Sequence, residues 1–286
     1  MLIIRKLFSR VRAYFPLIKS LQTGLLLSTG IAGYLSAHTA PQFTQLLALA
    51  GSLFLAISGS TILNMWYDHD IDTVMKRTHN RPLASGKVSL TEAFWLGAIF
   101  SLVGVGWAFA MDVLYGWVVL AGLFFDVLIY TIWLKRRTSW SIVWGGISGG
   151  MPILAGRVLA IGEIDLIGLL LAMAVLFWIP THILTFSMRY FDDYQKAGVP
   201  TFASAYGLET TRAIIALSAI IAAASIGVAG VMIGVQAGAL RLMAVLSTGL
   251  LLLSFASVFR PSERVNFSLF KYASVYMLAS MILLSL

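Results

Sequence analysis

The chain has 286 residues, of which 59% are hydrophobic and 11% are charged, and its mean hydropathy is +0.89. A soluble domain carries roughly 25% charged residues, so this composition excludes a soluble globular protein and indicates an integral membrane protein. The absence of cysteine excludes disulfides, thiolate metal sites and thiol nucleophiles. The apolar runs have the length of membrane-spanning helices, whereas barrel strands would be short and alternating. The predicted fold class is therefore all-α.

The apolar runs predict nine membrane-spanning helices in a single domain that comprises the whole chain, 1–286. Residues 1–16 carry arginines and lysines among apolar side chains. We expect them to form an amphipathic segment on the cytoplasmic membrane surface. The predicted spans are 17–37, 43–66, 93–110, 116–134, 142–161, 166–186, 212–232, 238–259 and 268–286.

The lysines and arginines are distributed unevenly between the two ends of these spans. Eighteen of the 20 lie at or near one end, and only Arg157 and Arg241 lie at the other. Cytoplasmic connections of membrane proteins are enriched in Lys and Arg, so the N-terminus is predicted inside and the C-terminus outside. This distribution also accounts for the net charge of +8 without a nucleic-acid partner. The chain is thus predicted to be a multi-pass protein of the cell (inner) membrane.

Two long cytoplasmic connections contain clustered aspartates. Asn64, Asp68 and Asp72 follow one another at four-residue spacing after the second span, and Asp192 and Asp193 follow the sixth. If the second span continues as a helix, the first three share one face. Carboxylates and an amide oxygen suit a Mg²⁺ ion that bridges to phosphate oxygens. The alternative is that these acids are solvated residues that balance nearby Lys and Arg.

Basic residues follow the first acidic connection and the fourth span. Arg77 and Arg81 come directly after the aspartates, and Lys135, Arg136 and Arg137 end the fourth span on the same side. Guanidinium groups bind phosphate through two hydrogen bonds, and Lys acts as a point charge. These residues are therefore candidate ligands of a phosphate-bearing substrate. For 135–137 the alternative is an anchor at the cytoplasmic membrane surface.

Two ionisable residues lie inside predicted spans, where they are costly and usually functional. Asp126 in the fourth span must be protonated, paired or exposed to a wet cavity, and the sequence does not identify its partner. His182 follows Pro180 in the sixth span. It is either functional or hydrogen-bonded to a neighbouring helix. The glycine pairs within 145–150 predict close helix packing.

The stretch from Asn64 to Leu83 resembles the Asp-rich motif of the UbiA superfamily of intramembrane prenyltransferases. It is most similar to the branch of protoheme IX farnesyltransferases, and the stretches 130–146 and 178–200 resemble the same branch. The resemblance implies a nine-helix bundle around a central cavity that opens to the cytoplasm and to lipid. It implies that Asp68, Asp72, Asp192 and Asp193 are catalytic and, with Asn64, hold Mg²⁺. The implied substrate-binding residues are Asn64, Arg77, Arg81, Lys135, Arg136, Arg137, Tyr190 and His182.

By the same resemblance, the donor is farnesyl diphosphate, and a vinyl group of protohaem IX attacks the allylic cation. Addition of water then gives haem O. The haem is a substrate rather than a cofactor, and His182 is expected to contact it or its iron. Other membrane enzymes of the haem pathway are expected as partners. Two alternatives stay open: a related prenyltransferase with a quinone precursor or lipid as acceptor, and an ion-coupled transporter.

Overall fold

The computed structural model describes residues 13–37, 40 and 42–286, and all regular secondary structure within these residues is helical. Eight of the described helices are long and apolar enough to cross a membrane, which confirms the predicted all-α membrane class. They are α3 (Phe43–Tyr67), α5 (Leu90–Met111), α6 (Val113–Leu123) with its continuation η2 (Phe124–Leu134), α7 (Ser141–Ile161), α8 (Leu166–Arg189), α10 (Phe202–Ile233), α11 (Ala237–Phe259) and α12 (Glu263–Leu284).

The predicted count of nine spans stays a prediction. Helix α2 (Ser20–Leu35) occupies the place of the first predicted span, but its 16 residues are fewer than the roughly 20 that cross a bilayer. The short helix η1 (Phe15–Ile18) precedes it, and Lys19 between them has a left-handed backbone with φ of 44°. The predicted amphipathic N-terminal segment lies mainly outside the described residues.

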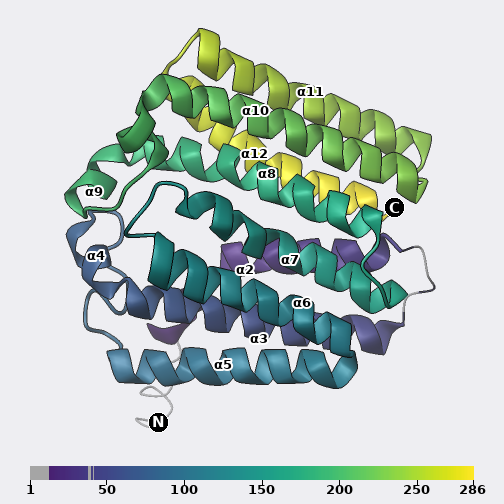
Figure 1. The fold of residues 1–286 in the computed structure, drawn as a ribbon, viewed down its shortest axis with the longest axis horizontal. Helices are drawn as coiled ribbons and strands as arrows, with labels where there is room; N and C mark the ends of the chain where they lie inside the picture. Colours follow the sequence, from purple (N-terminus) through teal and green to yellow (C-terminus); the bar gives the residue numbers. More distant parts are fainter. Residues whose placement is uncertain (1–12, 38–39, 41) are drawn as a thin grey trace, which may run out of the picture.

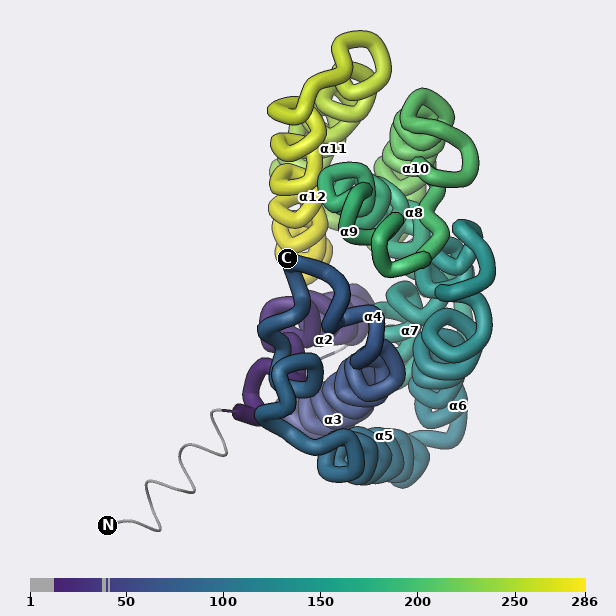
Figure 2. Tube along the Cα trace, turned by 90° about the vertical axis from the view of Figure 1, so that its left-hand side faces the viewer, coloured from purple at the N-terminus to yellow at the C-terminus, as the bar shows by residue number. Residues whose placement is uncertain are grey.

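The long helices lie side by side, and two short helices lie at one end of the bundle (Figure 1). Helix α4 (His69–Val74) follows α3, and α9 (Phe191–Lys196) follows α8. Figure 2 looks toward that end, with α4 and α9 nearest the viewer. The C-terminus lies at the opposite end (Figure 1). The fold therefore brings the two acidic connections to the same end of the bundle.

Glycines allow α7 to approach both α2 and α8 closely. A Cβ atom on Gly156 would lie 1.8 Å from the carbonyl oxygen of Gly30, and one on Gly150 would lie 2.8 Å from that of Ala172. The obstacle in each case is backbone, which cannot move aside as a side chain can. The close packing predicted for the glycines of the fifth span is confirmed at the contact between α7 and α8.

A buried arginine joins three segments at the end of the bundle opposite α4 and α9. Arg157 on α7 donates hydrogen bonds of 2.8 and 2.7 Å to the two carboxylate oxygens of Asp165, which precedes α8. It also donates to the carbonyl and hydroxyl oxygens of Ser36, just after α2, at 2.9 and 3.0 Å. The hydrogen bond from Arg157 holds the pKa of Asp165 below its ordinary value.

Candidate active site

A cavity of ≈ 550 Å³ lies within the bundle, between α2, α3, α6, η2, α7, α8 and α12. Most of its lining is apolar, and its ionisable side chains are Asp126, Tyr130 and His182. Its volume falls in the range of about 300–1,000 Å³ that is typical of small-molecule sites. The structure thus contains a cavity of the kind that the sequence analysis anticipated, with few polar groups to orient a ligand.

The intramembrane carboxylate Asp126 has partners on α3. The amide nitrogen of Asn64 donates to Asp126 Oδ2 at 2.9 Å, and the hydroxyl of Ser60 donates to the same oxygen. Thr131 in turn donates to the amide oxygen of Asn64 at 2.7 Å. The side chain of Asn64, predicted to be a metal ligand, therefore belongs to a hydrogen-bonded network with Asp126 beside the cavity.

The π-helical conformation of η2 brings its polar residues to one side. Hydrogen bonds in a π-helix join residues five apart, and the backbone N–H of Lys135 donates to the carbonyl oxygen of Tyr130 at 2.8 Å. In an α-helix, residues five apart are rotated by about 140° around the axis. The polar side chains of Asp126 and Thr131 in η2, and of Lys135 directly after it, all contact residues between Ser60 and Asp68.

Asp68 and Asp72 are buried beside different cations. Lys135 forms a salt bridge with Asp68, and Arg136 lies 3.8 Å from its other oxygen. Arg81 donates hydrogen bonds of 2.9 and 2.8 Å to the two oxygens of Asp72. The carboxylates are 5% and 6% exposed, which contradicts the alternative that these two acids are solvated loop residues.

The second acidic connection meets the first at Arg77. The backbone N–H of Arg77 donates to Asp193 at 3.4 Å, and its guanidinium group donates to the Tyr194 hydroxyl at 3.5 Å. That group lies 4.6 Å from the ring centroid of Phe186 and 5.4 Å from that of Tyr190. Tyr190 and Asp193 thus lie next to the first connection, whereas Asp192 is exposed.

The basic triplet at the end of η2 divides between two environments. Lys135 is directed toward Asp68, whereas Arg136 forms hydrogen bonds of 2.6 and 2.7 Å with Asp70, which is 52% exposed. The hydrogen bond from Arg136 lowers the pKa of Asp70. Arg137 is exposed. Lys135 therefore belongs to the candidate site, and the position of Arg137 suits an anchor at the membrane surface.

The predicted metal ligands do not form a closed cage. Among the residues that the structure describes, no three His, Cys, Asp or Glu side chains converge closely enough to hold an ion. Mg²⁺ usually takes one or two carboxylates together with substrate phosphates and waters. Asp68 Oδ1 is buried without a hydrogen-bond donor. This donor set therefore fits a Mg²⁺ ion that binds together with a diphosphate.

Lys19 is a candidate that the sequence analysis did not single out. Burial, and then the nearby charges of Arg81 and Lys135, lower its pKa to about 8. A positive φ is uncommon for residues other than glycine, and Lys19 is the one such residue in the described chain. The available signal was a lysine near the start of the first predicted span, directly before α2, but it was indistinguishable from a membrane-surface charge.

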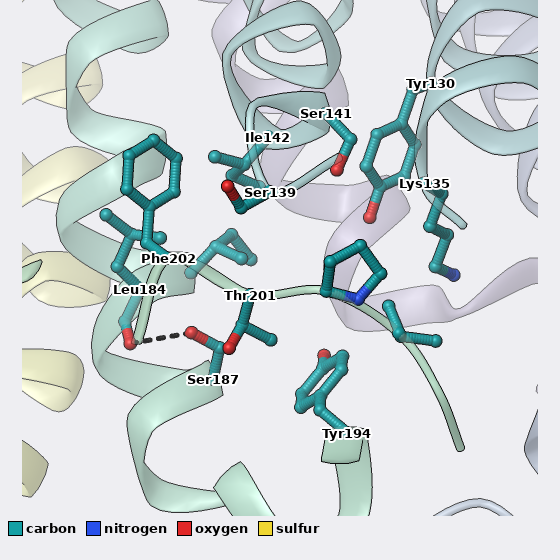
Figure 3. Close-up of a pocket in the computed structure, with 13 residues that line it drawn as sticks. Tyr130, Lys135, Ser139, Ser141, Ile142, Leu184, Ser187, Tyr194, Thr201 and Phe202 are labelled. Carbon is teal, nitrogen blue, oxygen red and sulfur yellow. Dashed lines mark hydrogen bonds between the residues drawn. The ribbon is translucent and has the colours of Figure 1, made fainter. Parts of the chain in front are cut away.

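A smaller pocket of ≈ 40 Å³ adjoins the cavity, and Tyr130, Ile142 and Ile183 line both. Figure 3 shows Tyr130 and Lys135 on one side of this pocket and Ser187 on the other. Lys135 thus lines this pocket and also forms the salt bridge with Asp68.

His182 lies between two aromatic rings on the cavity wall. Its ring centroid is 4.9 Å from that of Trp178 and 4.5 Å from that of Phe270, with interplanar angles of 16° and 22°. Its Nδ1 atom lies 3.3 Å from the Ser274 hydroxyl, which donates to the carbonyl oxygen of Phe270 at 3.4 Å. The ring and the Ser274 hydroxyl are thus within hydrogen-bond distance of each other on the cavity wall.

The sequence matches the family described as "UbiA prenyltransferase family" over residues 25–278. It is similar to a protein of Archaeoglobus fulgidus named protoheme IX farnesyltransferase. The two are 42% identical over 200 residues, which cover 70% of this chain and 70% of that protein.

The fold is similar to two solved membrane-protein structures. One is of a digeranylgeranylglyceryl phosphate synthase, with a TM-score of 0.80 and 16% identity over 97% of this chain and 98% of that one. The other is a UbiA homolog from Archaeoglobus fulgidus bound to GPP and Mg²⁺. It has a TM-score of 0.69 and 14% identity over 96% of this chain and 100% of that one.

Proposed function

This chain belongs to the UbiA prenyltransferase family, and from that premise we propose that it transfers a farnesyl group from farnesyl diphosphate to protohaem IX, giving haem O. The similar protein of Archaeoglobus fulgidus carries the name of that activity. The observation that carries the proposal is the cavity itself, which is lined by Asp126 and His182 and which adjoins, at Tyr130, the smaller pocket that Lys135 lines. A diphosphate site at Lys135 and a metalloporphyrin site at His182 would therefore meet at this cavity.

The donor's diphosphate binds where the two acidic connections meet. Lys135, Arg81 and Arg77 provide positive charge to the departing pyrophosphate, and Lys19 adds a fourth cation. Mg²⁺, which the solved homolog holds with GPP, would neutralise further negative charge on the leaving group. Preorganised charge at a leaving group is usually a large part of catalysis. The aspartates at positions 68, 72, 192 and 193 would hold the ion.

The apolar wall protects the reactive intermediate from water. When the bond between C1 of the farnesyl group and the diphosphate oxygen breaks, an allylic cation forms. Exclusion of water prevents its hydrolysis. The electron pair of the vinyl group then forms the new carbon–carbon bond, and water adds to the resulting carbocation with loss of a proton. This sequence gives the hydroxyethylfarnesyl side chain of haem O.

His182 binds the acceptor. Neutral imidazole with a free nitrogen lone pair is a common iron ligand. In the tautomer with the proton on Nδ1, His182 would donate to the Ser274 hydroxyl, which lies 3.3 Å away, and Nε2 would be the free nitrogen. The stacking of His182 between Trp178 and Phe270 fixes the plane of the ring. A fixed imidazole supports binding of haem iron rather than an aromatic acid or a phospholipid as acceptor.

The protein is an integral multi-pass membrane protein, and we place its active site on the cytoplasmic side. The clustering of lysine and arginine at the end that carries α4 and α9 supports this orientation. The N-terminus is then cytoplasmic, and the C-terminus lies outside. Other membrane enzymes of haem metabolism are its proposed neighbours, since substrate and product are both sparingly soluble.

The test incubates membranes that contain the protein with labelled farnesyl diphosphate, Mg²⁺ and one acceptor at a time. The acceptors are protohaem IX, an aromatic quinone precursor and a glycerol phosphate lipid. We expect only protohaem IX, among the three acceptors, to gain the mass of a farnesyl group and a water molecule. Label on another acceptor would retain prenyl transfer and reject haem. Cation flux in sealed vesicles without loss of diphosphate would instead identify a transporter.

A further inference from the structure

A row of aromatic rings runs along the contact between α8 and α12. Trp178, His182 and Phe270 form its inner part, and Phe267 continues it, 6.2 Å from Phe270 with an interplanar angle of 11°. Successive rings are therefore nearly parallel. The inner three line the cavity.

Two hydrogen bonds fix the position of α8 relative to α12. The Asn266 amide of α12 donates to the carbonyl oxygen of Thr185 at 2.8 Å. The indole N–H of Trp178 on α8 donates to the carbonyl oxygen of Ala273 at 2.7 Å. Because both bonds join side chain to backbone across the two helices, the rings between them cannot slide relative to one another. The row is a rigid support.

Two cations lie at the outer end of the row, toward α9. The guanidinium carbon of Arg189 lies 4.0 Å from the centroid of Phe267, and the ammonium of Lys271 lies 4.4 Å from it. Both residues are exposed. In the part of the chain that the structure describes, neither forms a salt bridge with a carboxylate.

Two positive charges beside one ring repel each other, and an anion that binds both removes that repulsion. Lys271 follows Phe270 in the chain, but its side chain extends one turn toward the start of α12, as helical side chains tilt. Arg189 reaches the same ring from the last residue of α8. The two helices therefore place both charges beside the same ring, which suits a ligand with two negative groups.

We propose that Arg189 and Lys271 bind the two carboxylates of the porphyrin acceptor, with the macrocycle along the aromatic row and the iron at His182. This inference rests on the proposed function and adds to it the groups that orient the acceptor. In protohaem the two propionates lie on the edge opposite a vinyl group. Carboxylates held at Phe267 therefore direct that vinyl group past His182 and into the cavity.

The chemistry of the row matches a flat π system as well as a dianion. The edges of aromatic rings carry partial positive charge and attract the face of another π system. An imidazole that binds iron stands upright on the porphyrin plane. Phe270 and Phe267 are nearly parallel to His182, with interplanar angles of 22° and 11° between successive rings. Their edges would therefore point toward the face of the macrocycle. A phospholipid headgroup would use the cations but not the rings.

The test compares protohaem IX with its dimethyl ester, in which both carboxylates are neutral. The full chain in nanodiscs of uncharged phospholipid is titrated with each porphyrin, and binding is followed through the haem absorption band. We expect the wild-type protein to prefer the diacid by about 100-fold, since each charged hydrogen bond contributes about tenfold. Arg189→Gln or Lys271→Gln should reduce that preference about tenfold, and the double variant should abolish it.

Arg264→Gln is the matched control, because Arg264 is exposed near the start of the same helix and is not one of the two cations beside Phe267. It should leave the preference unchanged, and Arg189→Lys should retain most of it. Unchanged binding of farnesyl diphosphate shows that each variant is folded. The inference is overturned if the wild-type protein does not prefer the diacid, or if the double variant weakens both porphyrins equally. Diacid preference without farnesyl transfer would reject the proposed function and leave this site standing.

Discussion

Lys135 at the end of η2 forms a salt bridge with Asp68 at the end of α3, across 67 residues of sequence. The pair joins the first acidic connection to the helix that carries Tyr130 and Asp126, and both side chains are largely buried. Arg81 and Asp72 form a second pair close by. The acids and bases of the candidate site are therefore arranged as partners before any substrate binds.

Replacement of the paired aspartates should abolish transfer. We expect Asp68→Asn and Asp72→Asn each to lower turnover by roughly 100-fold or more. Each variant loses a carboxylate that would hold Mg²⁺, and with it the positive charge that stabilises the leaving group. Turnover with farnesyl diphosphate and protohaem measures this, and size-exclusion chromatography checks folding. Asp70→Asn is the matched control, since Asp70 is half exposed and points toward Arg136. Normal turnover in Asp68→Asn would remove Asp68 from the site.

Lys19 should make donor binding depend on pH. Its pKa of about 8 means that the free protein carries this charge below pH 8 and loses it as pH rises. KM for farnesyl diphosphate should therefore increase between pH 7 and 9. Lys19→Arg should flatten that dependence, because arginine stays charged. Lys19→Gln should raise KM about tenfold at pH 7. Identical profiles for wild type and Lys19→Arg would show that another group titrates.

The hydrogen bond between Ser274 and His182 should tune acceptor binding. Loss of a group that orients a metal-binding histidine costs about 10- to 100-fold in affinity. We therefore expect Ser274→Ala to weaken protohaem binding at least tenfold and His182→Ala to weaken it further. Absorption titration measures both, and KM for farnesyl diphosphate should stay within twofold of wild type. Equal losses for donor and acceptor would make His182 a structural residue.

The pair of Arg157 and Asp165 should stabilise the end of the bundle away from the site. The pKa of Asp165 is lowered in the folded protein. Its contribution to the free energy of unfolding is therefore fully present above the ordinary carboxylate pKa, and it is lost as the pH falls through the lowered pKa. Asp165→Asn leaves Arg157 buried without a counter-charge and should cost about 3 kcal/mol. Thermal unfolding in detergent measures it. The double variant Arg157→Gln with Asp165→Asn should recover part of the loss.

The sequence predicts the helical class and the polar end because both depend on local composition. Lengths of apolar runs determine which segments can span, and the uneven distribution of lysine and arginine separates the two ends. The two acidic connections could therefore be assigned to one end before any contact was known. The burial of Asp68 and Asp72 and the exposure of Asp70 also agree with the four-residue spacing from Asn64.

Partners that come from distant helices could not be predicted. Asp126 meets Ser60 and Asn64 because η2 is a π-helix. The residues of η2 are mostly apolar, so their sequence does not show that the helix changes from α to π. Arg77 contacts Tyr194 of the second connection because the chain leaves helix α4 after Val74, and the sequence did not predict that contact. These relationships depend on how helices cross and where they end, which local sequence does not specify.

The pairing of Asp68 with Lys135 has a consequence for the order in which ligands bind. Mg²⁺ alone would have to compete with the ammonium group for the carboxylate, and a diphosphate alone would have to draw Lys135 away from it. When both arrive together, each takes the partner that the other releases. The two ligands should therefore bind cooperatively, each raising the affinity for the other by the same factor. A site built in this way discriminates against free cations and free phosphate, and it becomes loaded only with the complete metal–diphosphate substrate.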